Sequence, residues 1–313
     1  MKFYILTSRH IDFLKRHANT IPIKDQVVVI NSLNDDYIDQ ASKYCRENSI
    51  EYYVTESDGT PATGKNSVMK VFLESDNEYM VQVDGDDTIS EYGHQFYNSV
   101  AESEDPPDLI ILYNQFQRWT RVWRINDITG ERVPAKVIRN QPWTRPHRPY
   151  KPEDPPEWLG DLEYLPLPEA KKKVTLEKQY HARSTFLDWA WRHGQGSPES
   201  QKRDIFQRMV FYSRKAAELV HFDCELTIGE DTIAGLKMKE HFVNGDIKVL
   251  RNDEQINGGY DWTYLYNEGN GVVMGEFDLQ GYEWYIKVMK YINKNNLIEK
   301  YKHIEDVIIP DII

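Results

Sequence analysis

The sequence predicts an α/β fold, in which a Rossmann-type mixed, mostly parallel sheet is flanked by helices. Two observations predict it. Over the first 115 residues, short apolar runs of strand length alternate with segments whose apolar residues recur at helical spacing. The runs are spaced so that a helix fits between them, as parallel strands require. In such a sheet, ligands bind at the edge where the strands end.

The first half of the chain contains five predicted strands and three predicted helical faces. The strands are residues 3–6, 27–30, 51–55, 79–83 and 109–113. The helical faces are Ile38, Ala41 and Cys45, then Val68, Val71 and Phe72, then Ile89, Phe96 and Val100. Asp35 or Asp36 is available to cap the first helix, because a short acidic side chain can accept a hydrogen bond from the helix N-terminus.

The alternation stops near residue 118. Nine of the fifteen prolines fall between residues 134 and 168, and residues 118–170 also hold four tryptophans, which predicts a long ordered excursion or extended arm and no regular domain. A strand is predicted again at 209–213, a helix at 214–220 and another opening at Glu230, and the tail from 279 to 305 is typical of a long amphipathic helix. The predicted parts are therefore 1–115, an α/β half; 116–170, the insert; 171–278, a second half; and 279–313, a C-terminal helix and tail.

The composition is that of a globular protein, with 313 residues, 40% of them hydrophobic, and a net charge of −12. No apolar run approaches the roughly 18–20 residues that cross a bilayer, and we expect no membrane association. Two cysteines outside any CxxC or Cys/His cluster suggest neither disulfides nor zinc. With no signal-peptide layout at the N-terminus, we expect a cytoplasmic protein. The sequence gives no indication of its oligomeric state.

Three carboxylates follow the fourth predicted strand within four residues: Asp84, Asp86 and Asp87. Carboxylates this close repel one another, so a cation among them is expected. A divalent metal that carries a phosphorylated ligand fits, since Mg²⁺ is usually held by one or two carboxylates together with substrate phosphates. The alternative interpretation is an acidic turn that caps the next helix, with Asp87 or Thr88 as the N-cap.

The stretch from Gly59 to Asn66 nearly matches the phosphate-binding P-loop pattern. That motif needs a Ser or Thr directly after its lysine, where this chain has Asn66. Two interpretations of Lys65 stay open: it contacts phosphate at a helix N-terminus, or it is a solvated loop lysine.

The order of these motifs is more specific than any one of them. The set contains Thr7-Ser8-Arg9, Asn31 to Asp36, Gly64-Lys65-Asn66, Val83 to Asp87 and, far downstream, Gly229-Glu230-Asp231. It resembles the inverting glycosyltransferases of the GT-A fold, family 2 in particular, over residues 1–115 and 205–275. The resemblance implies a GT-A-like fold, a DxD acid cluster that holds Mn²⁺ or Mg²⁺ with a nucleotide sugar, and a late Glu-Asp pair that supplies the catalytic base.

The resemblance assigns roles to positions of this chain. It places the metal at Asp84, Asp86 and Asp87, with Asp86 near the ribose, and the base at Asp231 with Glu230 beside it. The donor, expected to be a UDP-sugar, would contact Thr7, Arg9, Asp35 or Asp36, Lys65, Asp84 and Asp86. A carboxylate within hydrogen-bond reach can take the proton of an attacking hydroxyl. Helix capping by dipole-favoured acids is the alternative for Glu230 and Asp231.

The insert carries a basic patch on an acidic chain. Residues 118–151 hold nine Lys or Arg against two acids, a charge of +7, which leaves −19 on the rest. The candidate acceptor-binding residues are Arg118, Arg121, Arg124, Arg139, Trp143, Arg145 and Arg148. Arginine neutralises phosphate and aromatic rings stack on exposed bases, so DNA is the preferred partner. A basic sleeve around an acidic glycan and Arg–Trp stacking that only holds the insert down are the alternatives.

These observations lead to one preferred function and three rivals. The preferred one is an inverting transferase that moves a sugar to a hydroxymethylated pyrimidine in DNA, by analogy with bacteriophage enzymes, which would act in the host cytoplasm. The rivals are a glycosyltransferase acting on a surface glycan, a P-loop-like kinase built around Lys65, and an inactive nucleic-acid-binding module.

Overall fold

The computed structural model describes residues 1–85, 87–89, 91–112, 209–226, 229–252, 290–291 and 293–304, and the backbone of strands 115–117, 122–125, 132–137, 141–143, 162–164 and 264–266. The chain forms two compact units. Unit 1 comprises residues 1–113, 205–265 and 309–313, and unit 2 comprises residues 114–204 and 266–308. Most described residues belong to unit 1, which also contains the predicted acids and Lys65.

Unit 1 is built on a seven-stranded sheet with the order β13-β6-β12-β4-β1-β2-β3. The strands are β1 (Lys2–Thr7), β2 (Gln26–Asn31), β3 (Glu51–Thr55), β4 (Tyr79–Asp84), β6 (Leu109–Leu112), β12 (Met209–Ser213) and β13 (Val249–Asn252). Only β12 runs against its neighbours, lying antiparallel between β4 and β6, and the other pairs are parallel. The predicted α/β fold with a mixed, mostly parallel sheet is therefore confirmed, and each predicted strand that lies within the described residues forms.

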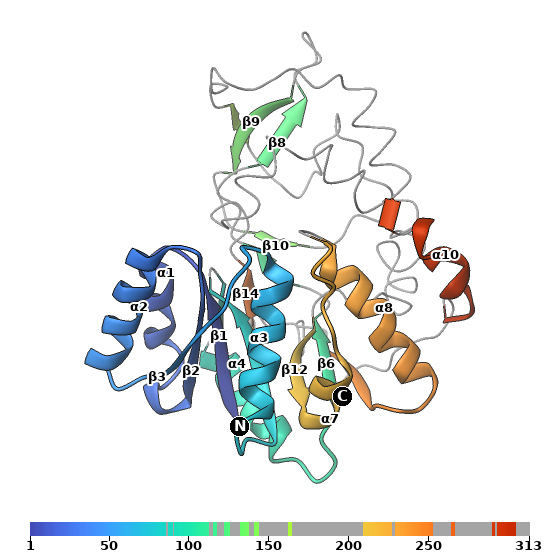
Figure 1. Cartoon of the computed structure of the whole chain (residues 1–313), viewed down its shortest axis with the longest axis horizontal. Helices are drawn as coiled ribbons and strands as arrows, with labels where there is room; N and C mark the ends of the chain where they lie inside the picture. The colour runs from blue at the N-terminus through green and yellow to red at the C-terminus, as the bar shows by residue number, and fades with distance from the viewer. Residues whose placement is uncertain are drawn as a thin grey trace. The chain divides into compact units, whose positions relative to one another are not determined.

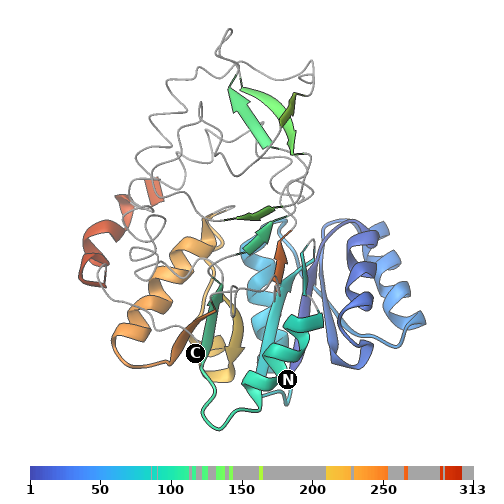
Figure 2. The same ribbon diagram turned by 180° about the vertical axis from the view of Figure 1, so that it is seen from behind.

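Helices cover both faces of this sheet (Figures 1 and 2). One face packs against α3 (Pro61–Leu73), α7 (Arg214–Leu219) and α8 (Glu230–Val243), and the other packs against α1 (Ile11–Arg16), α2 (Asp35–Glu47) and α4 (Glu91–Ala101). Alternation along the strands divides the core accordingly: Tyr4, Val27 and Val29 face α3, whereas Phe3, Ile5 and Val28 face α2. Among the described residues, no helix is long and apolar enough to cross a membrane.

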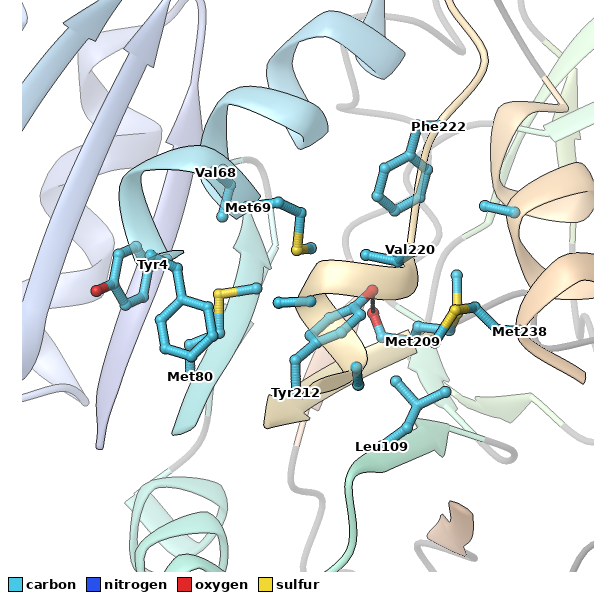
Figure 3. Close-up of a cluster of buried hydrophobic side chains, with 14 of the residues drawn as sticks. Tyr4, Val68, Met69, Met80, Leu109, Met209, Tyr212, Val220, Phe222 and Met238 are labelled. Carbon is cyan, nitrogen blue, oxygen red and sulfur yellow. Dashed lines mark hydrogen bonds between the residues drawn. The ribbon is translucent and has the colours of Figure 1, made fainter. Parts of the chain in front are cut away.

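A bulge in β12 alters this alternation at the centre of the sheet. The register of β12 against β6 shifts between Met209 and Phe211. Because of the shift, Met209 and Tyr212 both face the α3 side, although they are three residues apart. Figure 3 shows the result: the Tyr212 hydroxyl turns back and donates a hydrogen bond to the carbonyl oxygen of Met209 at 3.1 Å.

The structure corrects three details of the predicted helices. Asn34 caps α2, and its Oδ1 accepts from the Tyr37 amide at 3.0 Å, so Asp35 and Asp36 are exposed first-turn residues and not caps. Ile89 lies in the short strand β5 (Thr88–Ile89) outside α4, which begins at Glu91, so neither Asp87 nor Thr88 is positioned to cap that helix. A β-branched pair suits the extended conformation that β5 adopts as it pairs with β14 (Tyr264–Tyr266).

The tail contains no continuous helix over its described residues. Asn296 has a left-handed backbone, with φ 49°, and precedes the short helix α10 (Leu297–Lys300), which the 3₁₀ turn Lys302–Ile304 follows. An α-helix cannot pass through a left-handed residue, so the predicted helix over 279–305 is interrupted there. Residues 279–289 lie outside the described residues.

Unit 2 contains strands in a region where the sequence predicts an irregular arm. β8 (Val122–Ile125), β9 (Arg132–Val137) and β11 (Leu162–Tyr164) form an antiparallel sheet with β9 in the middle, and β7 (Gln115–Gln117) pairs with β10 (Gln141–Trp143). Pro134 in β9 and Pro142 in β10 obscured these strands, because proline within a run argues against a strand.

Gly85, directly after β4, tests how tightly the acid turn is packed. A Cβ at this position would lie 2.4 Å from the backbone oxygen of Leu6, so Gly85→Ala must move one of the two strand ends. We expect a loss of about 1–3 kcal/mol in the free energy of unfolding, measured by urea denaturation. Gly64→Ala is the matched control, because its Cβ would meet side-chain atoms and no backbone: Leu6 Cδ2 at 3.0 Å and Asn31 Oδ1 at 3.4 Å. Equal stability of the Gly85 variant and the wild type would contradict this packing.

Candidate functional site

The acids after β4 lie in a tight turn at the carboxyl edge of the sheet. Asp84 is the last residue of β4, and its carbonyl oxygen accepts from the Asp87 amide at 2.9 Å. Asp87 is buried, with 1% of its surface exposed, whereas Asp84 is half-buried. Asp86 lies outside the described residues. The turn thus holds two described carboxylates at the edge where the sequence predicts ligand binding.

A buried histidine lies behind this turn. His17, in the 3₁₀ turn His17–Asn19, donates from Nε2 to the Gly85 carbonyl oxygen at 3.3 Å. Burial lowers the pKa of His17 to about 4, so the ring is neutral at neutral pH. With Gly85 packed against Leu6, the histidine fixes the turn from its inner side.

The central ion pair of the site joins α3 to α8. The Lys65 ammonium lies 2.9 Å from Glu230 Oε1 and also contacts the Asp231 carboxylate. Lys65 is 7% exposed and Glu230 is 4% exposed, while the Asp231 side chain is 33% exposed. Lys65 is therefore not a solvated loop lysine, and Asp231 is the more accessible of the two carboxylates.

Asp84 contributes to the same charge balance. Burial disfavours the Lys65 ammonium, but the charges of Asp231, Glu230 and Asp84 outweigh it and raise the pKa of Lys65 well above 10.5. Burial, followed by the charge of Asp231, raises the pKa of Glu230 to about 7. One protein cation therefore stands among three carboxylates that come from strand β4 and helix α8.

The start of α8 explains how Glu230 and Asp231 come to face Lys65. Gly229, with φ 86°, occupies the N-cap position in a left-handed conformation that glycine adopts without strain. The two acids then fall in the first helical turn, where the helix dipole favours negative charge. Their placement agrees with helix capping, and it also brings both carboxylates to the lysine.

Aromatic residues lie close beside this ion pair. Lys65 Nζ is 5.4 Å from the centre of the buried Phe222 ring. Tyr212 is fully buried, and burial, with smaller contributions from Asp231 and Asp84, raises its pKa well above 10. Figure 3 shows both rings in the apolar cluster that lies between α3, β12 and α8. A low-polarity wall strengthens the electrostatic interactions of the ion pair.

The residues that the resemblance assigns to the donor lie at the neighbouring strand ends. Thr7 ends β1 and is buried, and its hydroxyl is hydrogen-bonded to the Tyr37 hydroxyl. Arg9 follows β1 and is exposed, and Asp35 and Asp36 are exposed at the start of α2. These loops are joined, since Ser32 Oγ donates to the Ser8 carbonyl oxygen at 2.7 Å.

The P-loop hypothesis does not agree with the local structure. α3 begins at Pro61 with Thr60 as N-cap, whose hydroxyl accepts from the Thr63 amide, so Gly64 and Lys65 lie inside the helix. A phosphate-binding loop needs its glycines in a non-helical turn whose amides point to the phosphate. The buried pairing of Lys65 with Glu230 also differs from a lysine that projects into a phosphate loop.

Most of the predicted acceptor residues cannot be placed. Arg118, Arg121, Arg139, Arg145 and Arg148 lie outside the described residues, and for Arg124 in β8 and Trp143 in β10 the structure describes the backbone only. The predicted metal site lies at the acid turn after β4. Over the described residues, no group of three or more His, Cys, Asp or Glu could hold a metal ion.

Two residues near the site were missed by the sequence analysis. Asn66 makes two hydrogen bonds to the backbone of Phe222, and His17 makes the contact with Gly85 already described. The Asn66 position did carry a signal, because an asparagine stands where the P-loop pattern needs Ser or Thr. A single histidine in a short polar segment carries no comparable signal.

Comparisons with known proteins give similarities to solved structures alone. No protein-family model matches the chain, and a search of curated proteins finds no match. The chain is similar to residues 1–349 of TarS from S. aureus, crystallised with UDP-GlcNAc, with TM-score 0.47 and 13% identity over 94% of this chain and 67% of that one. Against the longer TarS structure, the chain covers 40% of its length, with TM-score 0.43.

Two further structures are nucleotidyltransferases by their descriptions. An inositol-1-phosphate CTP transferase from T. maritima matches with TM-score 0.36 and 12% identity over 92% of this chain and 96% of that one. A putative glucose-1-phosphate thymidylyltransferase from Bacillus anthracis, in complex with a sucrose, matches with TM-score 0.34 and 12% identity over 80% and 86%. At these values the likeness does not extend to activity.

The raised pKa of Glu230 predicts a pH dependence of stability. The fold holds the Glu230 proton more tightly than the unfolded chain does, so this stabilising contribution is complete below about pH 4.5 and is lost as the pH rises to about 7. The difference in unfolding free energy between wild type and Glu230→Gln should therefore fall over that interval and level above it, as measured by urea denaturation at several pH values.

The control for this measurement is an exposed glutamate in α7, Glu218→Gln. Its difference from wild type should not fall over the same interval, because water already solvates that carboxylate. A difference for Glu230→Gln that stays constant with pH would show that the buried carboxyl does not hold its proton in this way.

Proposed function

We propose that this protein is an inverting glycosyltransferase that moves a sugar from a nucleoside diphosphate sugar, with UDP as the expected nucleotide, to an acceptor hydroxyl. The single observation that carries the proposal is the contact of Lys65 with Glu230 and Asp231. Lys65 precedes Glu230 by 165 positions and Asp231 by 166 positions in the sequence. The three residues nevertheless meet beside the strand end that holds Asp84. Three of the ordered motifs that resemble family 2 glycosyltransferases, those of Lys65, Asp84 and the Glu230-Asp231 pair, thus contribute to one charged site.

Within this site, we assign the role of general base to Asp231. Its carboxylate is partly exposed, whereas that of Glu230 is buried and has its pKa raised to about 7. A base must reach the acceptor hydroxyl, and only the more accessible carboxylate meets that condition. Glu230 then serves to hold Lys65, and Lys65 in turn holds the Asp231 carboxylate in place.

A divalent ion, Mn²⁺ or Mg²⁺, fits the chemistry of the acid turn. Asp84 and Asp87 offer hard carboxylate oxygens, and one or two carboxylates together with substrate phosphates form the usual Mg²⁺ environment. When bound, such an ion would neutralise charge on the departing diphosphate. Asp86, which the resemblance places near the ribose, completes the proposed donor set with Thr7, Arg9, Asp35 and Asp36.

For the acceptor, we propose a hydroxymethylated pyrimidine in DNA. The support is the +7 charge of residues 118–151 and the arginines and tryptophans within that segment. A nucleobase hydroxyl would have to be presented to Asp231 by a surface that neutralises phosphates and stacks on neighbouring bases. A surface glycan is the rival acceptor and would not need this charge.

Asp231→Asn should separate transfer from donor binding. The variant keeps the shape of the side chain but cannot take a proton, so we expect transfer to fall about 10²–10⁴-fold. A UDP-sugar with Mn²⁺ should still raise the apparent melting temperature, since a ligand that binds the native state stabilises it. The control is Asp246→Asn beyond the C-terminal end of α8, which should transfer at the wild-type rate. Full turnover by Asp231→Asn would exclude it as the base.

Neutralising Arg118, Arg121 and Arg124 together should weaken DNA binding and flatten its dependence on salt. Each phosphate contact that is lost should reduce the slope of log K against log salt by about 0.9. The control exchanges three exposed lysines of unit 1, Lys24, Lys43 and Lys70, for glutamine, which changes the net charge equally. Equal slopes for the two triple variants would count against the insert as the DNA-binding surface.

A further inference from the structure

The Asn66 side chain holds the main chain of Phe222 at two points. Its Oδ1 accepts from the Phe222 amide at 3.0 Å, and its Nδ2 donates to the Phe222 carbonyl oxygen at 2.8 Å. The amide group thus satisfies both polar atoms of a residue whose side chain is buried. This pair of hydrogen bonds between α3 and the segment after α7 is called the Asn66 clamp below.

A carboxamide side chain supplies both halves of this clamp at once. Asparagine offers a donor and an acceptor on separate atoms, spaced to match the amide and carbonyl of one peptide residue. A carboxylate has no donor for the Phe222 carbonyl, and the single oxygen of serine or threonine cannot contact both atoms. The residue that breaks the P-loop pattern is therefore the one that this packing needs.

The clamp acts beside the catalytic carboxylates, because Lys65 and Asn66 are neighbours in α3. Lys65 holds the first turn of α8 through Glu230 and Asp231, and its ammonium also lies over the Phe222 ring. Asn66 holds the segment that leads into that turn. Two successive residues of one helix thus fix the chain on both sides of the loop that precedes α8.

The base of α3 that makes these contacts is itself closely packed. A Cβ at Gly64 would lie 3.0 Å from Leu6 Cδ2 and 3.4 Å from Asn31 Oδ1, so this turn of the helix rests directly on β1 and β2. At its other end, α3 is held by Arg214, whose guanidinium donates to the carbonyl oxygens of Leu73 and Ser75 at 2.6 and 2.7 Å. A helix fixed at both ends can act as a rigid support for a second segment.

We propose that Asn66 is a positioning residue that sets the place of the α8 N-terminus, and so of Asp231, by holding Phe222. The role in transfer rests on the glycosyltransferase function proposed above. Asn66 does not touch the reacting atoms, so its loss should displace the base without removing donor contacts. Misplacement of a catalytic group by about 1 Å can cost roughly a hundredfold in rate.

The first test compares kcat and KM for Asn66→Ala. We expect kcat to fall about ten- to a hundredfold while KM for the donor changes little. Asn77→Ala is the matched control. Asn77 follows α3, and its side-chain amide donates to the Tyr4 hydroxyl at 3.0 Å and to neither Glu230 nor Asp231. This variant should keep the wild-type kcat. A drop in kcat that is equal in both variants would reduce Asn66 to a general stability role and overturn the proposal.

The second test uses hydrogen exchange and needs no activity. In Asn66→Ala, exchange should accelerate at the Phe222 amide and also at the Ile233 amide, which donates to the Gly229 carbonyl oxygen at 3.1 Å in the first turn of α8. Thr63→Ala, which removes a neighbouring side chain that contacts Cys224 but not Phe222, should leave both amides protected. Faster exchange at Phe222 with an unchanged Ile233 would show a clamp that does not reach α8, and the proposal would fail.

The two tests separate this proposal from the proposed function. Wild-type protein that transfers no sugar, together with faster exchange at both amides in Asn66→Ala, would reject the glycosyltransferase and keep Asn66 as the residue that positions α8. If Asn66→Ala does not fold, Asn66→Ser gives the same comparison with a smaller change in polarity. Normal kcat and unchanged exchange in a folded Asn66→Ser variant would reject the positioning role.

Discussion

The site depends on one buried ammonium group. Lys65 compensates negative charge that comes from the end of β4 and from the first turn of α8, two segments with more than a hundred residues between them. A buried ion pair of this kind is costly to break, because removing one partner leaves an uncompensated charge that costs about 3–5 kcal/mol. The positions of α3, β4 and α8 are therefore coupled through a single side chain, and the geometry of the acids follows from where that side chain can reach.

This arrangement changes the electrostatic interpretation of the acid turn. From the sequence alone, the mutual repulsion of the aspartates after β4 suggested that a divalent cation must lie among them. Lys65 supplies part of that balance from within the protein. The metal in the proposed function then has a narrower task. If bound at the acid turn, it would neutralise the charge of an arriving diphosphate, while Lys65 balances the charge of the carboxylates from within the protein.

Local pattern predicted the sheet, and long-range contacts decided the site. The strand Gln26–Asn31 is buried along its whole length, and a continuous apolar run in the sequence indicates such a strand. The pairing of Lys65 with Glu230 had no such signal, since it depends on α8 lying beside α3 after a long excursion of the chain. The cap of α2 is Asn34 and not Asp35 or Asp36, because α2 begins at Asp35. Residue propensities do not locate a helix boundary to within one residue. β9 and β10 were not predicted because each contains a proline, and proline within a run argues against a strand. Both strands form nevertheless, since they pair with neighbouring strands.

The place of β12 has a consequence for how the protein is made. β4 and β6 both pair with β12 and not with each other. The centre of the sheet therefore cannot form until residues 209–213 have been synthesised. During synthesis, β4 and β6 leave the ribosome well before their common partner and expose open strand edges meanwhile. Unpaired edges in a half-made chain invite association with other nascent chains. Assembly of unit 1 should thus be slow and late, and a chaperone that shields those edges would raise the yield of native protein.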